Sequence, residues 1–122
     1  MGAIRAFLLF EAIAFGLASL IHRGLLVDGF ADPGASTAEG IIGLVLAAGL
    51  AGTFLFASAA RVIGLVAQTF ALLGTSIGLF LVIRGVGPNT VPDVIFHVGI
   101  YLVIILALIV TARTRPEPAP AD

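Results

Sequence analysis

The chain has 122 residues, of which 60% are hydrophobic and 11% are charged. Soluble domains carry about 25% charged residues, so this composition excludes an ordinary water-soluble fold. The formal net charge is −1, and six arginines without a lysine cannot form the basic face that nucleic acid binding requires. The absence of cysteine excludes disulfides and thiolate metal sites.

Four apolar segments follow one another along the chain, and we expect helices at about 4–24, 38–60, 62–84 and 92–112. Each is close to the ~20 residues that a helix needs to cross a bilayer. Backbone polar groups cannot face lipid unpaired, so the segments should be helical. The sequence therefore predicts an all-α protein, a four-helix antiparallel transmembrane bundle that forms one domain over 1–112. The first segment does not resemble a cleaved signal peptide, because Glu11 interrupts its apolar core.

Arginine placement predicts the orientation in the membrane. With four spans both termini lie on one side, together with Arg5, Arg61, Arg113 and Arg115, while Arg23 and Arg84 lie on the other. The positive-inside rule then places both termini in the cytoplasm. Arginine without lysine, with abundant Ala, Gly, Val and Leu, is typical of a GC-rich bacterial genome, so we expect the bacterial cytoplasmic (inner) membrane. The Pro-rich residues 113–122 are expected to form a disordered cytoplasmic tail.

Local signals mark the helix starts and the packing faces. Ser36 and Glu39 have capping-box spacing before the second span, and Thr90 and Asp93 have it before the fourth. Small residues recur four apart and predict close helix contacts. These pairs and runs are Ala12 and Gly16; Gly43, Ala47 and Ala51; Ala48 and Gly52; and Gly74 and Gly78.

Three polar residues are expected in one layer within the membrane. Counted from the arginines at the cytoplasmic end, Glu11, Thr53 and Gln68 lie at similar depth, ~9–12 Å inside the boundary. A carboxyl group in hydrocarbon is costly and requires partners. Glu11 is therefore either a protonated hydrogen-bonding group that fixes helix register, or an acid that carries protons or binds a ligand.

A second polar group is expected near the outer face. His22 lies eleven residues after Glu11, almost three helical turns, so the two share a helix face. Asp93 and His97 share a face of the fourth span, and Glu39 opens the second span at similar depth. These four residues can converge from three helices as a ligand-binding cup. Two imidazoles with two carboxylates also suit Zn, Mn or Fe, and two histidines can hold haem. Helix capping and simple hydrogen bonding are the alternatives, so the cofactor stays unknown.

Four stretches carry a resemblance to known proteins. FEAIAFGLASLIHRG, TAEGIIGLVLAAGL, AQTFALLGTSIGLF and GVGPNTVPDVIFHVGIY resemble small uncharacterised four-span membrane proteins of high-GC bacteria. In topology and size the chain is also similar to the DoxX-like membrane proteins. The second resemblance implies a link to redox or membrane-assembly functions and assigns no residue roles.

Three function classes agree with these patterns. The first is a non-catalytic accessory or structural subunit, or a small-ligand binder. The second is a small proton-coupled transporter that uses Glu11, and the third is a metal- or haem-binding redox protein that uses His22 and His97. The expected partners are the lipid bilayer and either a second copy of the chain or a membrane partner protein, and not nucleic acid. The apolar fourth span permits such a contact without requiring it.

Overall fold

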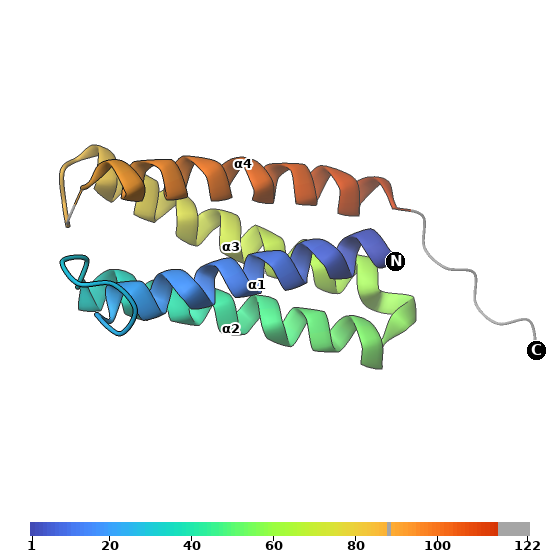
Figure 1. Ribbon diagram of the computed structural model, residues 1–122. Coiled ribbons are helices and arrows are strands. Elements are labelled where there is room, and N and C mark those ends of the chain that lie inside the picture. Colours follow the sequence, from blue (N-terminus) through green and yellow to red (C-terminus); the bar gives the residue numbers. More distant parts are fainter. Residues whose placement is uncertain (88, 115–122) are drawn as a thin grey trace, which may run out of the picture.

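The structure is a computed structural model that describes residues 1–87 and 89–114, and it confirms the all-α fold. The long helices are α1 (Gly2–His22), α2 (Pro33–Leu55), α3 (Ala60–Ile83) and α4 (Val91–Arg113), and a short 3-10 turn, η1 (Ala57–Ala59), joins α2 to α3. Successive helices run antiparallel (Figure 1). The predicted disordered tail lies outside the described residues from 115 onward, whereas Arg113 belongs to α4.

Each of the four helices is long and apolar enough to span a membrane. Large apolar side chains are exposed along all four, for example Leu44, Val66 and Leu102, whereas the buried core is formed by residues such as Leu8, Leu46 and Ile104. Such an apolar exterior suits lipid and not water. The protein is therefore a multi-pass membrane protein with four spans.

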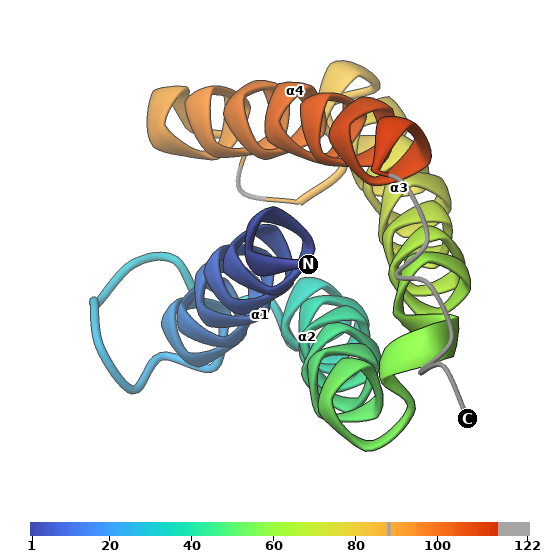
Figure 2. The same ribbon diagram turned by 90° about the vertical axis from the view of Figure 1, so that its right-hand side faces the viewer.

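The two ends of the bundle contain different parts of the chain. The loop end contains the α1–α2 and α3–α4 connections, and the termini end contains Met1, the α2–α3 connection and the last turn of α4 (Figure 1). Viewed along the bundle, α1 lies beside α2 and α3 lies beside α4 (Figure 2). Both ends of the described chain are thus on one side of the membrane.

Small residues permit close helix contacts at predicted positions such as Gly43 and also at Gly49, which was not among them. A Cβ on Gly43 would lie 3.4 Å from the backbone N of Gly16, which confirms the contact between α1 and α2. A Cβ on Gly49 would lie only 2.8 Å from Cβ of Ala67, so α2 and α3 also meet closely. In contrast, Ala47 and Ala51 are exposed and take no part in these contacts.

The second helix begins earlier than the sequence predicted, at Pro33, and ends earlier, at Leu55. Its N-cap is Asp32, whose Oδ1 accepts from the backbone N–H groups of Gly34 and Ala35. The predicted cap at Ser36 is therefore wrong, because Asp32 followed by Pro33 provides a stronger start one turn earlier. At α4 the predicted capping box of Thr90 and Asp93 is confirmed.

Candidate functional site

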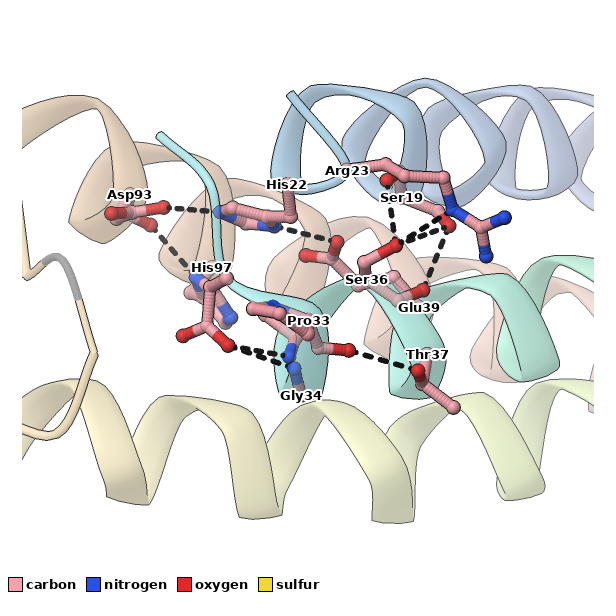
Figure 3. A network of polar contacts seen from close by, with 12 residues as sticks. Ser19, His22, Arg23, Pro33, Gly34, Ser36, Thr37, Glu39, Asp93 and His97 are labelled. Carbon is pink, nitrogen blue, oxygen red and sulfur yellow. Dashed lines mark hydrogen bonds and ion pairs between the residues drawn. The ribbon is translucent and has the colours of Figure 1, made fainter. Parts of the chain in front are cut away.

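The most connected polar group at the loop end is the imidazole of His22. Its Nδ1 lies 2.7 Å from Oε2 of Glu39, and its Nε2 lies 3.1 Å from Oδ1 of Asp93 (Figure 3). All three side chains are buried. Carboxylates only accept hydrogen bonds, so a doubly protonated ring donates to both. One side chain of α1 thereby ties α2 to α4.

The first turn of α4 holds two of these groups in place. Oδ2 of Asp93 accepts from the Thr90 hydroxyl at 3.1 Å, which leaves Oδ1 for His22. One turn later, Nδ1 of His97 donates to the backbone carbonyl of Asp93 at 2.8 Å. With the proton on Nδ1, the neutral ring of His97 has an acceptor at Nε2. The spacing of four residues thus gives this helix a carboxylate and an imidazole on one buried face.

A pair of serines fixes the register of α1 against α2 beside the cluster. The Ser19 hydroxyl donates to the carbonyl of Ser36 at 2.7 Å, and the Ser36 hydroxyl donates to the carbonyl of Ser19 at 3.0 Å (Figure 3). Each serine lies three residues before a site residue, His22 or Glu39, and therefore on the same helix face. That spacing was visible in the sequence, but the two serines were not among the predicted site residues.

Next to this cluster lies a cavity of about 260 Å³, to which all four helices contribute. It extends from the loop residues Asp32 and Asn89 down to Thr75. His22, Glu39, Asp93 and His97 all line it, so the structure brings the four predicted outer residues to one space. The remaining wall is largely apolar and includes Phe15, Ile42 and Leu81. Apolar walls with a few convergent polar groups are typical of small-molecule sites.

Two of the side chains that line the cavity, Glu39 and His97, have an acceptor atom without a hydrogen-bond partner among the described residues. Oε1 of Glu39 is buried and has no hydrogen-bond partner among the described residues, although the side chain lines the cavity. Nε2 of His97 makes no hydrogen bond with the described residues either. It lies beside Gly78, and a Cβ added to that glycine would be 3.1 Å from this nitrogen. Three carboxylates, those of Asp32, Glu39 and Asp93, line the cavity without an Arg among its described lining residues.

The donor set does not fit a transition metal in the arrangement found. Within residues 1–87 and 89–114 no group of three His, Cys, Asp or Glu side chains is placed to hold a metal ion. Both ring nitrogens of His22 face carboxylate oxygens, and Nδ1 of His97 faces a carbonyl. One free imidazole nitrogen is too few for a zinc site or for haem held by two histidines.

The inner polar layer is built differently from the prediction. Glu11 and Gln68 are both completely buried, but neither carboxyl oxygen of Glu11 nor Nε2 of Gln68 has a hydrogen-bond partner among the described residues. Oε1 of Gln68 accepts from the Thr111 hydroxyl at 2.9 Å. Thr111 was not predicted, although it lies fourteen residues after His97, close to four helical turns and so on the same face.

Thr53 belongs to the termini end and not to the layer of Glu11. Its hydroxyl donates to the Leu50 carbonyl, while the Arg5 guanidinium donates to its Oγ1 at 3.3 Å and to its carbonyl at 2.7 Å. Arg61 lies at the termini end as well, where its guanidinium donates to the Ala112 carbonyl. The depth of Thr53 was counted back from Arg61 through residues that are not part of α2, which explains the error.

No protein-family model, curated protein or solved structure matches this chain. The resemblances drawn from the sequence thus receive no family assignment, and only the four-span membrane architecture carries over from them.

Proposed function

We propose that this protein is a non-catalytic ligand binder of the bacterial cytoplasmic membrane, with both termini in the cytoplasm. Its ligand site is the loop-end cavity, which then faces the outer side. The observation that carries the proposal is the Glu39 side chain, which lines the cavity and whose Oε1 is buried without a hydrogen-bond partner among the described residues. Leaving such an acceptor unpaired costs about 1–3 kcal/mol, and a ligand donor removes that cost.

The ligand should be small and should donate hydrogen bonds. Glu39 Oε1 and His97 Nε2 both accept, and the three carboxylates of the wall outnumber its one protonated imidazole, that of His22. A primary ammonium group supplies three donors and a positive charge, so it satisfies both requirements. The volume of about 260 Å³ suits an amine with a compact apolar body.

Three probes with one body and different heads test this chemistry: cyclohexylamine, cyclohexanol and cyclohexane carboxylate. The purified protein in lipid nanodiscs is unfolded thermally in the presence of each compound. Binding to the folded state stabilises it by about 2.7 kcal/mol when the ligand is at 100 times its dissociation constant. We expect the amine to raise the midpoint most, the alcohol less, and the carboxylate not at all. Equal effects of the three, or an effect of the carboxylate alone, would remove the proposal.

A second candidate function rests on the complete burial of Glu11. Neither of its oxygens has a hydrogen-bond partner among the described residues, and ionisable side chains inside membrane spans often belong to proton relays. A proton-coupled transporter would lose its pH-driven flux in proteoliposomes on Glu11→Gln while the fold is kept. Flux that is unchanged in Glu11→Gln eliminates this candidate.

The accessory-subunit role is a proposal of the same class, because an accessory subunit is also a non-catalytic protein. The exposed apolar residues of α4, such as Ile95 and Leu102, provide a surface on which a partner helix or a second copy can pack. Purification in a mild detergent tests this role through the mass of the particle. A particle that contains a single chain in every detergent used would count against it.

A further inference from the structure

A second hollow, of about 430 Å³, lies between α1 and α4 at the loop end. Its walls are apolar, with Ala14 and Leu17 from α1, Phe96 from α4, and Phe30 from the α1–α2 connection. Leu17 is 49% exposed, so this groove opens on the surface that faces lipid. Its described lining includes two ionisable side chains, and these are His22 and Asp93.

His22 and Asp93 therefore line both spaces, the groove on one side and the loop-end cavity on the other. The 3.1 Å contact between His22 Nε2 and Asp93 Oδ1 crosses from α1 to α4 at this position. The two spaces thus adjoin at these two side chains. On the far side of His22 and Asp93 lies the cavity that Glu39 and His97 also line.

We propose that groove and cavity form one binding path for a single-chain amphiphile with a primary amine head. The amine lies against Glu39 in the cavity, and the alkyl chain lies between α1 and α4 along Ala14, Leu17 and Phe96. The inference rests on the proposed function, since it places the amine in the same site, and it adds the chain and the route through the bilayer.

Charge and surroundings argue for this occupant over an ordinary bilayer lipid. The polar wall at the inner end of the groove carries two carboxylates, those of Asp93 and Glu39, and between them the protonated imidazole of His22, so that negative charge is in excess by one. Anionic phosphate heads are repelled there, whereas an ammonium is attracted. Lipid tails are as apolar as the groove, so a chain gains little by leaving the bilayer and the head must provide the selectivity.

Photo-crosslinking in nanodiscs tests the path. The probe is a twelve-carbon primary amine with a diazirine midway along the chain, and crosslinked peptides are mapped by mass spectrometry. We expect labelling of α1 and α4 around Leu17 and Phe96, with competition by dodecylamine and none by dodecanoate. Ala14→Phe fills the groove and should reduce the labelling at least tenfold, while Ala47→Phe on the exposed face of α2 leaves it unchanged.

The outcomes separate the inference from the proposed function. If cyclohexylamine binds but the amphiphile labels all lipid-facing helices evenly, the groove proposal is overturned and the cavity proposal stands. If neither amine binds, both fail. If dodecanoate reduces the labelling as strongly as dodecylamine does, the proposal of an amine head is also overturned. Cyclohexylamine binding to Ala14→Phe serves as the test that this variant still folds.

Discussion

Nε2 of His22 lies 3.1 Å from Oδ1 of Asp93, and this contact joins the first helix to the last across 71 positions of sequence. The opposite ring nitrogen of His22 lies 2.7 Å from Glu39. The imidazole is therefore placed between two buried carboxylates, and the arrangement of the loop end depends on it.

Removal of this imidazole should destabilise the bundle. In His22→Ala the carboxylates of Glu39 and Asp93 lose their shared donor while both stay buried, and breaking a buried ionic contact costs about 3–5 kcal/mol. Reversible unfolding in mixed micelles measures the change, with the exposed substitution Leu44→Ala as control. A loss no larger than that of Leu44→Ala would show that the ring does not connect the helices.

The opposite effect is expected at the other buried glutamate. Neither oxygen of Glu11 has a hydrogen bond of good geometry among the described residues, so Glu11→Leu removes a polar group at the loss of no more than a weak contact with the Gln68 amide. Replacing an unpaired buried polar group by an apolar one of similar size is neutral or stabilising, by about 1–3 kcal/mol. The same unfolding measurement applies. A marked loss of stability would mean that the carboxyl group holds helices together, as in the register-fixing interpretation.

Close packing of α2 on α3 gives a third prediction. A Cβ at position 49 would lie 2.8 Å from Cβ of Ala67, and both atoms are fixed to helix backbones. Gly49→Ala should therefore cost about 1–3 kcal/mol through overpacking. Gly99→Ala, whose Cβ would have no neighbour within 4 Å, should have no such cost. Ala67→Gly should restore the stability of Gly49→Ala, and failure of this rescue would contradict the contact.

Orientation can be tested directly because the chain lacks cysteine. Single cysteines are introduced by Asp28→Cys in the α1–α2 connection and by Ser58→Cys in the α2–α3 connection. A membrane-impermeant maleimide should label Asp28→Cys in intact bacterial cells and Ser58→Cys only after the cytoplasmic membrane is opened. The reverse pattern would invert the topology and place the cavity on the cytoplasmic side.

The parts of the fold that depend on local sequence were predictable. Four apolar segments gave four helices, and the capping box of Thr90 and Asp93 is a contact within one turn, so spacing alone identified it. At α2 two local signals competed, and Asp32 with Pro33 begins the helix in place of Ser36. The sequence contains both capping signals and does not show which of the two begins the helix.

Contacts between helices were predictable only in part. The shared face of Glu11 and His22 is a property of one helix, and both side chains are indeed buried. The depth of Thr53 depended on where α2 ends, and residues 56–59 do not continue that helix, so Thr53 lies beside Arg5. The hydrogen bond of Thr111 to Gln68 depends on how α4 is rotated about its axis relative to α3, and residue spacing within one helix does not determine that rotation.

The most direct test of the account is the dissociation constant of cyclohexylamine measured by titration calorimetry in nanodiscs. We compare the unmodified protein with Glu39→Gln and with Glu11→Gln. The second substitution changes the other buried glutamate, which is not among the residues that line the cavity. Loss of one charge-assisted hydrogen bond, about 1.5–3 kcal/mol, predicts that Glu39→Gln weakens binding at least tenfold. Glu11→Gln should leave the constant unchanged. Equal affinity of the unmodified protein and Glu39→Gln would contradict a ligand site at this carboxylate.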